Sequence, residues 1–473
     1  MTPCRTSDLA AVDVRRPSSA VWFGALGLIL GLAAAIRTLG ANAGLPLPLL
    51  NPDEENLVPR AWELVHGGGL DPGWYDYPSL LFLVLAPSQL GFDEPAYGAA
   101  RVVAVIIGVA GVAAAWWLGR ASYGRLSGLV GAVGVAVATT HVAYSRMAVT
   151  DVLLTLGITV TLALLVSGRI EWAGVAAGLA ASAKYPGVLL LVPLVVAGFG
   201  DWRRVGRGSA LAAAAFVLTS PFVVLHAGAA WDDISRVQRL AQSGWLGFED
   251  DPVTPLAFAE RLWQTLGPLA LVGLAGVAIA AWRHTRRDLV LLSFVAVYAL
   301  SLLPAEAHYD RYVLPLVPVL CVVAGRGRWL AAAALVAALV PLSWSIDDAR
   351  ALTPHDPRLD AAVWIEGNVP AGERIAVDPS TLPPDPPRVV RLELPGPERP
   401  FDTRRDLGAL RRAGFRWLVV GDSVTERVVD EASHYPPETR FYRSLSDRPP
   451  AFEARSDSDE RGRRWVRVYR IYP

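Results

Sequence analysis

Residues 180–189, Ala-Ala-Ser-Ala-Lys-Tyr-Pro-Gly-Val-Leu (AASAKYPGVL), decide how this chain is threaded, and they contain Lys184, the only lysine in the sequence. They lie inside an apolar segment, 171–200, that has arginines before and after it. Because arginine gathers at the cytoplasmic ends of short loops, both ends of this segment belong on one side of a membrane. Pro186 and Gly187 permit a sharp bend between two short helices. We therefore expect a helical hairpin with Lys184 at its outer tip.

The composition is typical of a polytopic helical membrane protein. The chain is 53% apolar with a mean hydropathy of +0.35, and apolar blocks of about 20 residues, long enough to cross a bilayer, alternate with arginine clusters. No convincing cleavage site follows the first block, 21–35, so we interpret it as a retained membrane helix. The net charge is zero, which gives no basis for a nucleic-acid partner. Cys4 and Cys321 suggest neither a disulfide nor a metal site.

The arginines also fix the expected orientation. The apolar segment 79–90 is too short to span, so we place it at the outer interface. About eleven crossings then put the N-terminus, with Arg15 and Arg16, in the cytoplasm and the C-terminus outside a bacterial inner membrane. The expected helices lie at about 20–40, 98–118, 127–143, 151–167, two within 171–200, 209–226, 262–282, 288–303, 312–325 and 329–346. The arginines expected inside are Arg120, Arg125, Arg169, Arg203, Arg204, Arg207, Arg283, Arg286, Arg287, Arg326 and Arg328.

A change in composition near residue 349 divides the chain into a membrane module, 1–348, and a soluble α/β domain on the outer face, 349–473. The patterns predict helices at 361–369 and 407–414 and strands at 374–378, 389–394, 415–421 and 465–472. Gly-Asp-Ser at 421–423 is interpreted as a loop, and we assign this domain no catalysis. The segment 227–261 fits equally well a mobile lid or an amphipathic interfacial helix.

Charged and aromatic side chains gather at the outer face in this topology. Asp53 and Glu54 follow the first helix, Asp76 and Tyr77 precede the interfacial segment, and Asp151 opens a later helix. The remaining candidates are three cations, Lys184, Arg146 and Arg311, with His308, Asp310 and Tyr312 beside the last of them. A carboxylate can take a proton from an attacking hydroxyl, and cations can hold a phosphate that departs with negative charge. The set therefore suits group transfer from a lipid phosphate.

Each residue also has a structural interpretation of its own. Asp53 and Glu54 can simply stabilise a helix start through its dipole, and Asp151 can be an N-cap. Lys184 can be an interfacial lysine whose charge snorkels to water, and Arg311 can anchor a helix at the membrane surface. Only the joint occurrence of these groups on one face favours a functional site.

Six motifs spread over residues 20–330 resemble a known family. They are PDE (52–54), RAWEL (60–64), YDYPSL (75–80), SRMAVTD (145–151), AKYPG (183–187) and RYVLPLVP (311–318). The array resembles the GT-C glycosyltransferases of the glycosyltransferase 39 type, among them protein O-mannosyltransferases and lipid A aminoarabinose transferases. The resemblance implies an inverting transfer of a sugar from a polyprenyl-phosphate carrier to an acceptor hydroxyl or amino group at the outer membrane face.

The resemblance also implies roles for individual residues. Asp53 corresponds to the catalytic base with Glu54 beside it, and Asp151 to a carboxylate that positions the acceptor or the base. Lys184 and Arg311 would bind the lipid phosphate, with Arg146 as a third cation at the same level. Contacts to the substrate are expected from Asp76, Tyr77, His308 and Tyr312.

Two other functions remain open on the sequence. A lipid or sugar transporter would have inverted repeats and ionisable residues at mid-membrane, and neither stands out here. A catalytically inactive GT-C scaffold would keep the fold alone. We expect no required cofactor. Asp53, Glu54, Asp76 and His226 could supply ligands to a divalent metal, but no spacing in the sequence requires one. The expected partners are the bilayer, the lipid-linked donor and an acceptor that is a protein, a lipid or a wall glycan.

Overall fold

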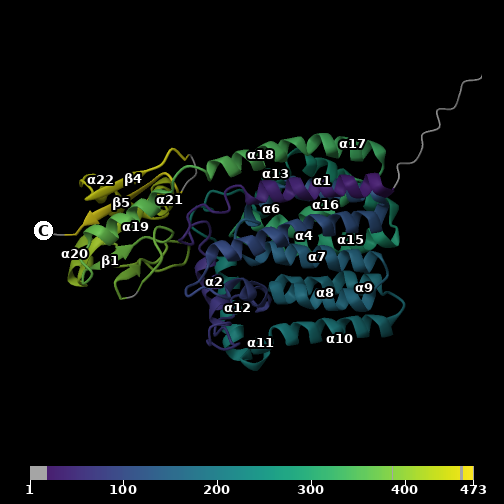
Figure 1. Ribbon diagram of the computed structural model, residues 1–473, viewed down its shortest axis with the longest axis horizontal. Helices are drawn as coiled ribbons and strands as arrows, with labels where there is room; N and C mark the ends of the chain where they lie inside the picture. Colours follow the sequence, from purple (N-terminus) through teal and green to yellow (C-terminus); the bar gives the residue numbers. More distant parts are fainter. Residues whose placement is uncertain (1–18, 386, 459–461, 472–473) are drawn as a thin grey trace, which may run out of the picture.

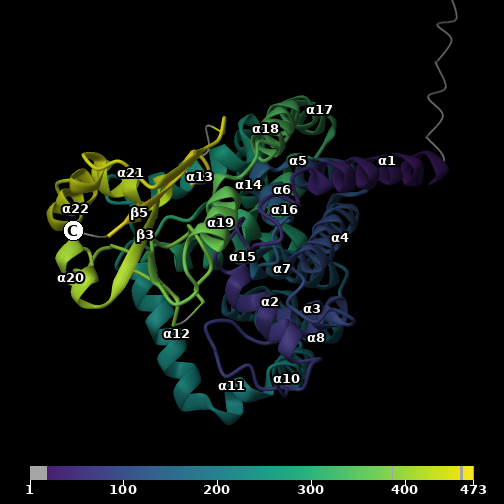
Figure 2. The same ribbon diagram turned by 60° about the vertical axis from the view of Figure 1, so that its left-hand side comes forward.

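The computed structural model describes residues 19–385, 387–458 and 462–471, so Cys4, Arg15, Arg16 and the final position of the strand expected at 465–472 lie outside the described residues. A bundle of roughly parallel helices forms the larger part, and a small α/β domain stands at one end of it (Figure 1). Figure 2 shows the same arrangement from the side, with α12 reaching away from the sheet.

The first half of the bundle contains most of its long helices. Helix α4 ends at Tyr123 because Gly124 adopts a left-handed φ of 102°, which lets α5 fold back along α4. The elements are α1 (Ser19–Thr38), α2 (Glu54–Glu63), α3 (Leu80–Leu85), η1 (Ala86–Gln89), α4 (Tyr97–Tyr123), α5 (Arg125–Val137), α6 (Thr139–Tyr144), α7 (Thr150–Val166), α8 (Ile170–Ala183), η2 (Tyr185–Leu190), α9 (Leu191–Ala197) and α10 (Trp202–Thr219).

The second half completes the bundle and leads to the small α/β domain, which is called the outer domain below after its expected side of the membrane. Thr285 and Asp288 form a capping box that begins α15. The elements are α11 (Pro221–Leu225), α12 (Ala227–Gln242), α13 (Thr254–Leu266), α14 (Pro268–Arg283), α15 (Arg286–Leu302), η3 (Asp310–Leu316), α16 (Val317–Ala324), α17 (Arg328–Ala337) and α18 (Leu339–Ala351).

Membrane-spanning character is strongest in a few of these helices. In the described part of the chain, Ser19–Thr38, Tyr97–Tyr123 and Arg328–Ala351 are long and apolar enough to cross a bilayer. The pair α13 and α14 would add one more span, but it bends by 115° at Gly267, where we expected one continuous helix. Several other apolar helices are shorter, among them α5, α7 and α8. The structure thus supports a membrane-embedded bundle without fixing the number of crossings at eleven.

The hairpin expected at Lys184 is present. Helix α8 ends at Ala183, and η2 and α9 return to Gly198, where an added Cβ would lie 3.4 Å from Ile170 at the start of α8. Gly187 makes the return possible, because a Cβ there would lie 2.4 Å from the backbone of Ala180. Lys184 therefore occupies the tip of the hairpin.

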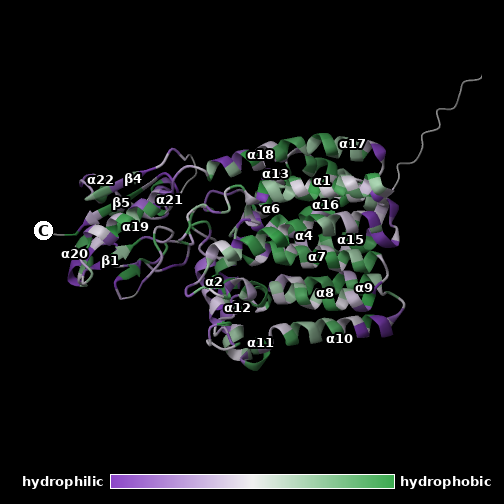
Figure 3. Ribbon diagram, in the orientation of Figure 1, coloured by the Kyte–Doolittle hydropathy of each residue, from purple (hydrophilic) through white to green (hydrophobic). Residues whose placement is uncertain are grey.

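The arginines assigned to the cytoplasmic side meet at the end of the bundle opposite Lys184. Arg204 pairs with Glu171 at 2.9 Å, Arg286 donates to the carbonyl of Ala197 at 2.5 Å, and Arg326 pairs with Asp288. Hydropathy colouring shows hydrophilic residues at this end and in the outer domain, with mostly apolar helices between them (Figure 3).

The outer domain is built on one mixed sheet in the order β2-β1-β3-β5-β4. Strands β1 (Arg374–Val377), β2 (Val389–Arg391) and β3 (Phe415–Gly421) are parallel, and β5 (Trp465–Arg470) and β4 (Phe452–Arg455) are antiparallel to their neighbours. Ile375 and Val377 pack with α19 (Pro357–Asn368), whereas Ala376 joins the core formed with the remaining helices. These are α20 (Leu407–Arg412), α21 (Asp422–Asp430) and α22 (Pro436–Ser446).

One expectation about local structure was wrong, and three elements were missed. Asp422 begins α21, so Gly-Asp-Ser at 421–423 opens a helix and is not merely a loop. The segment 79–90 forms a short helix that buries Leu81, Phe82 and Leu85 against α2 and leaves Leu83 and Leu90 exposed, so its place at the outer interface stays a prediction. β4, α21 and α22 had no predicted counterpart, because their patterns are short and interrupted by charged residues.

Candidate active site

Asp53 ends the loop after the first helix, and its side chain points to groups far away in sequence. Its Oδ2 accepts hydrogen bonds from Arg311 Nη1 at 3.0 Å and from the Tyr77 hydroxyl at 3.2 Å. It makes no capping hydrogen bond to α2, so helix capping does not explain this carboxylate. A quarter of the side chain (25%) is exposed, which leaves it accessible to a further partner.

Glu54 is adjacent in sequence but has a different environment. It is fully buried and forms a two-pronged ion pair with Arg101 of α4, at 2.9 and 2.7 Å. The same carboxylate accepts from the backbone N–H of Ala148 at 2.9 Å. These contacts fix the start of α2 against α4 and against the loop before α7, which sets the position of Asp53.

Asp151 and Lys184 form a second, nearly buried pair. Lys184 Nζ lies 2.6 Å from Asp151 Oδ1, and the two side chains are 12% and 4% exposed. Asp151 makes no capping hydrogen bond to α7, and its Oδ2 is buried without a hydrogen-bond partner within the described chain. An unsatisfied buried oxygen is costly, so this atom is a candidate contact for a ligand.

Tyr77 connects the two pairs. Its hydroxyl donates to Asp53, and its ring faces Lys184, with Nζ 5.4 Å from the ring centroid. Tyr312 lies on another side of the ammonium, with its ring centroid 5.9 Å from Nζ. Cations are stabilised over aromatic faces, so the two rings hold Lys184 in place without neutralising it.

Arg311 is placed by its own surroundings. Tyr144 donates to Asp310 at 2.9 Å, and Asp310 accepts from the Arg311 backbone N–H at 2.8 Å. The guanidinium lies over the Tyr309 ring at 4.7 Å, and its Nε is buried with no hydrogen-bond partner in the described structure. One nitrogen of this cation is therefore available to an anion.

A cavity of about 400 Å³ adjoins the Asp151–Lys184 pair. Asp151, Lys184 and the rings of Tyr77 and Tyr312 form part of its wall, and the remaining wall is mostly apolar. The apolar lining residues include Leu154, Val188, Leu189, Ile234, Val237 and Leu302. Val188 is 54% exposed on the bundle surface, so the cavity joins a polar end to the apolar exterior.

Asp76 lines the same cavity and connects it to α12. Its Oδ1 accepts from Arg236 of α12 at 2.5 Å, and Asp233 of α12 accepts from the Tyr75 backbone at 2.9 Å. Burial raises the pKa of Asp76 above its ordinary value, while Arg236 acts in the opposite direction. Helix α12 is therefore tied to the cavity by one ion pair and one hydrogen bond, and it supplies the helix anticipated within 227–261.

Besides Glu54, two predicted site residues lie elsewhere. Arg146 is fully buried and pairs with Asp348 of α18, away from Lys184. His308 contacts Asp251 at 3.1 Å and Thr254 at 3.2 Å, where it fixes the segment before α13. The structure thus brings together Asp53, Asp76, Tyr77, Asp151, Lys184, Arg311 and Tyr312, and leaves Glu54, Arg146 and His308 in separate contacts.

The residues considered for a metal are not assembled as ligands. Within the described ranges, no three His, Cys, Asp or Glu side chains form a group that could hold a metal ion. Asp53 contacts Arg311, Glu54 contacts Arg101, and Asp76 contacts Arg236. His226 instead bonds the Tyr75 hydroxyl at 2.7 Å.

Sequence reasoning missed Arg101, Tyr144 and Arg236, which position the predicted residues. Arg101 offered one signal, because it is a charge within the long apolar helix α4 and such a charge needs a partner. Tyr144 and Arg236 carried no comparable signal, since surface and interface positions accept both residue types.

Comparison with known proteins gives a consistent picture. Residues 91–226 match the family model described as dolichyl-phosphate-mannose-protein mannosyltransferase. The structure of ArnT from Cupriavidus metallidurans bound to undecaprenyl phosphate superposes with a TM-score of 0.59 at 13% identity, covering 95% of this chain and 98% of that one. The chain has the fold of the GT-C glycosyltransferases. The fold family suggested by the sequence motifs is therefore confirmed.

Another GT-C structure extends the likeness. AglB, the Archaeoglobus fulgidus oligosaccharyltransferase, in complex with an inhibitory peptide and a dolichol-phosphate, gives a TM-score of 0.59 at 12% identity and covers 90% of this chain and 72% of that one. No curated protein sequence matches the chain significantly. Because these identities are low, the GT-C likeness describes the fold, and the chemistry is argued from the side chains.

Proposed function

We propose that this protein is an inverting glycosyltransferase that moves a sugar from a polyprenyl-phosphate carrier to an acceptor hydroxyl or amino group. The observation that carries the proposal is one connected cluster. Asp53 with Arg311 and Asp151 with Lys184 are joined by Tyr77, beside a largely apolar cavity. A base, two cations and an apolar compartment are the parts that this reaction requires.

Asp53 is the proposed base. The acceptor oxygen attacks C1 of the sugar, the bond from C1 to the phosphate oxygen breaks, and Asp53 takes the acceptor proton. Attack from the face opposite the leaving group inverts C1. The exposed quarter of the Asp53 side chain gives an acceptor access, and Glu54, held by Arg101, acts as a positioning residue.

Lys184 and Arg311 are proposed to stabilise the departing polyprenyl phosphate. The carrier gains negative charge as the bond breaks, and cations in a water-poor site stabilise that charge strongly. Arg311 Nε, which is buried and has no partner among the described residues, supplies a donor for the phosphate. Asp151 sets the position of the Lys184 ammonium and keeps an unpartnered oxygen for the sugar. No metal is assigned to this charge neutralisation.

The prenyl chain is proposed to occupy the apolar end of the cavity. A second apolar cavity of about 390 Å³ between α8, η2 and α10 shares Tyr185 and Val188 with the first. Together they lead from Lys184 to the lipid-facing surface around Val188, which suits a donor that stays in the membrane. ArnT bound to undecaprenyl phosphate and AglB with a dolichol-phosphate are proteins of this fold with such lipids.

The charge distribution supports the proposed orientation and compartment. The arginine-rich end of the bundle is assigned to the cytoplasm, so the cluster and residues 349–473 belong to the outer face of a bacterial inner membrane. Residues 1–348 form the catalytic membrane module in this proposal. The proposed acceptor is a protein, a lipid or a wall glycan. The alternatives, a transporter or an inactive scaffold, would not catalyse sugar transfer.

The experiment that tests the proposal is binding of undecaprenyl phosphate to purified protein in nanodiscs. Lys184→Gln should weaken binding by at least about tenfold, because it removes one full charge from a shielded site. Arg204→Gln is the matched control, since it removes a cation from the opposite end of the bundle. Equal affinities of the Lys184→Gln variant and the unaltered protein would contradict the proposal.

A further inference from the structure

A separate cavity with a more polar wall lies where the bundle meets the outer domain. Its volume is about 180 Å³, room for several water molecules or one small anionic group. The bundle contributes Pro52, Arg146 and Asp348, and the outer domain contributes Arg358, Ser380 and Arg463. Pro52 immediately precedes Asp53, so the cavity adjoins the loop that carries the proposed base.

Arg146 provides the first sign that a ligand belongs here. It is fully buried, and its guanidinium contacts Asp348 and the carbonyl oxygen of Ile36 at 3.3 Å. Its Nε is buried and has no hydrogen-bond partner within the described structure. Leaving a charged donor unsatisfied costs about 1–3 kcal/mol or more, and an anion in the cavity would remove that cost.

The outer domain brings two further arginines to the same place. Arg358 is 6% exposed and is held by Asp356 through hydrogen bonds of 2.9 and 2.7 Å. Arg463 donates to the carbonyls of Leu352 and Pro354, each at 3.2 Å. Three guanidinium groups thus converge on the cavity, against two acids: Asp348, which lines it, and Asp356, which pairs with Arg358 and lies 3.6 Å from Arg463 Nε. Such planar donors match the oxygens of phosphate and carboxylate groups.

The sheet topology places this cavity at a typical binding position. β1 lies between β2 and β3, so the chain changes direction between β1 and β3. In open sheets of this kind, ligands bind outside the carboxyl ends of the strands at that point. Ser380 follows β1 and Ser423 follows β3, and both side chains line the cavity.

Ser380 is also held in an unusual backbone conformation. Its φ is 63°, the left-handed region that costs a residue with a Cβ about 1–2 kcal/mol. Its carbonyl accepts from Arg358 Nη1 at 3.2 Å, so the turn and the arginine fix each other. Local strain of this kind concentrates at ligand sites.

We propose that this junction cavity binds an oxyanion, a phosphate or carboxylate group, carried by the acceptor. The assignment to the acceptor rests on the proposed glycosyl transfer, whereas the binding of an anion does not. Held there, the charged group anchors the acceptor beside Pro52, with its nucleophile free to reach Asp53. The outer domain would then supply part of the acceptor specificity.

The test is calorimetric binding of inorganic phosphate and of glycerol 3-phosphate to the full-length protein, without donor or turnover. Arg358→Gln and Arg146→Lys should each weaken binding at least tenfold. The first substitution removes a guanidinium group, and the second replaces a guanidinium group with the single ammonium of lysine. Arg350→Gln, which alters an exposed arginine of α18, should leave the affinity unchanged. Thermal unfolding of each variant verifies that it is folded.

Each outcome bears on one proposal only. Binding of glycerol 3-phosphate at least as tight as that of phosphate, and sensitive to Arg358, supports an acceptor group. Binding of inorganic phosphate that is tighter than binding of glycerol 3-phosphate would overturn the acceptor assignment. Absence of binding, or binding lost in Lys184→Gln but retained in Arg358→Gln and Arg146→Lys, would overturn the junction site. Neither result would affect glycosyl transfer, because the measurement involves no sugar donor.

Discussion

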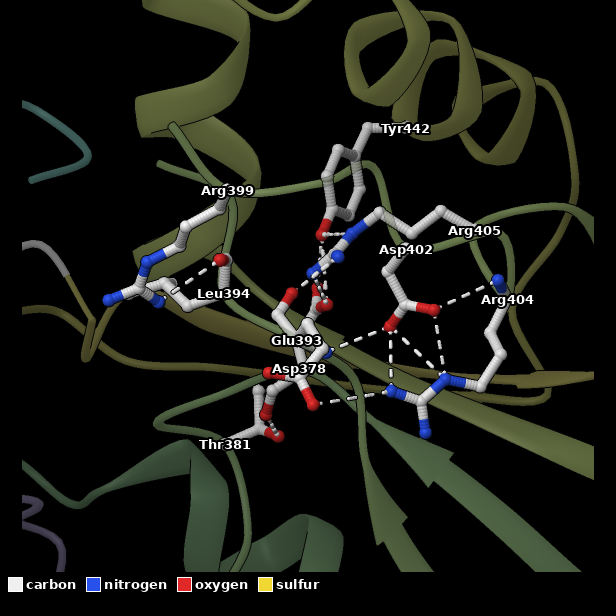
Figure 4. A network of polar contacts seen from close by, with 9 residues as sticks. All are labelled: Asp378, Thr381, Glu393, Leu394, Arg399, Asp402, Arg404, Arg405 and Tyr442. Carbon is white, nitrogen blue, oxygen red and sulfur yellow. Dashed lines mark hydrogen bonds and ion pairs between the residues drawn. The ribbon is translucent and has the colours of Figure 1, made fainter. Parts of the chain in front are cut away.

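The protein contains two clusters of buried charge that differ in how completely their atoms are satisfied. The outer-domain cluster surrounds Asp378, whose two oxygens accept from Tyr442 at 2.8 and 2.9 Å and from Arg405 at 3.3 Å (Figure 4). Asp402 beside it accepts from Arg404 and from the Glu393 backbone. Every oxygen of these two carboxylates has a donor, so the cluster cross-links β1 to the segments around 393–405 and to α22.

The bundle cluster is incomplete by comparison. Asp151 keeps one buried oxygen and Arg311 one buried nitrogen without a partner in the described chain, and an apolar cavity begins at Lys184. Buried polar atoms are normally satisfied. The contrast indicates that ion pairing alone does not mark a functional site. Ion pairs that keep unsatisfied hydrogen-bonding atoms beside a cavity do.

The largest expected effect is on the rate of sugar transfer. It is seen when one aspartate of each cluster is replaced by asparagine. Asp53→Asn should lower the rate of sugar transfer at least about 100-fold, because it removes the general base. Its thermal unfolding should change little by comparison, since the amide oxygen of asparagine can still accept the hydrogen bonds from Arg311 and Tyr77. Turnover and unfolding of both variants provide the measurement.

Asp402→Asn is the matched variant in the outer domain, and it should do the reverse. It weakens the contacts to Arg404 and should lower the stability of that domain while turnover in the folded protein persists. Loss of turnover in Asp402→Asn but not in Asp53→Asn would contradict the assignment of catalysis to the bundle cluster and of a structural role to the outer-domain cluster.

The Asp151–Lys184 pair allows structure and binding to be separated. Lys184→Met leaves a buried carboxylate unpaired, which should cost about 3–5 kcal/mol. Adding Asp151→Asn should recover most of this stability, because the unpaired charge is then gone. Affinity for undecaprenyl phosphate should stay at least tenfold low in both variants. Recovery of affinity in the double variant would mean that the pair has only a structural role.

Asp378 makes the stability of the outer-domain cluster depend on pH. Burial raises the pKa of Asp378 to about 6, against the stabilising contacts of Arg405 and Tyr442. The unfolded carboxyl titrates near the ordinary value of about 3.9, so between these values the folded state binds more protons. The contribution of this group to stability therefore falls as pH rises from about 4 to 6 and is constant above that range.

The variant Asp378→Asn removes this titration. Its loss of stability relative to the unaltered protein should be about 1 kcal/mol larger at pH 5 than at pH 7.5, because one pKa unit corresponds to about 1.4 kcal/mol. Chemical unfolding at the two pH values, followed by a probe in the outer domain, measures the difference. A deficit that is equal at both values, or larger at pH 7.5, would contradict the assignment.

The smallest expected effect concerns α12. Arg236→Gln breaks the contact to Asp76 and should raise KM for the donor less than about fivefold, since a half-exposed ion pair is worth up to about 1 kcal/mol. Hydrogen exchange in α12 should become faster. Unchanged exchange would show that other contacts hold this helix over the cavity.

The sequence predicted those parts of the molecule that follow from one-dimensional rules. Arginine placement and the Pro186–Gly187 pair were enough to predict the hairpin at Lys184, and the topology drawn from the arginines was enough to place Asp53, Asp151 and Arg311 at one end of the bundle. Partner choice was less accessible, because it depends on the rotation and register of helices far apart in sequence.

Arg146 and His308 illustrate the limit. Both lie at the predicted membrane level, yet Arg146 faces Asp348 of α18 and His308 faces Asp251. Glu54 next to Asp53 likewise turns inward to Arg101, since neighbouring residues at a helix start point in different directions. The junction cavity could not be predicted at all, because it requires the docked position of the outer domain.

The most direct test of the central claim is release of undecaprenyl phosphate from a panel of undecaprenyl-phosphate sugars by the purified protein in nanodiscs. A mixture of candidate acceptors is present, and the Asp53→Asn variant is measured in parallel. We expect release with one sugar, transfer of that sugar to an acceptor and a loss of at least about 100-fold in Asp53→Asn. Equal release by the protein and by Asp53→Asn, or transbilayer movement of the lipid without cleavage, would contradict the central claim.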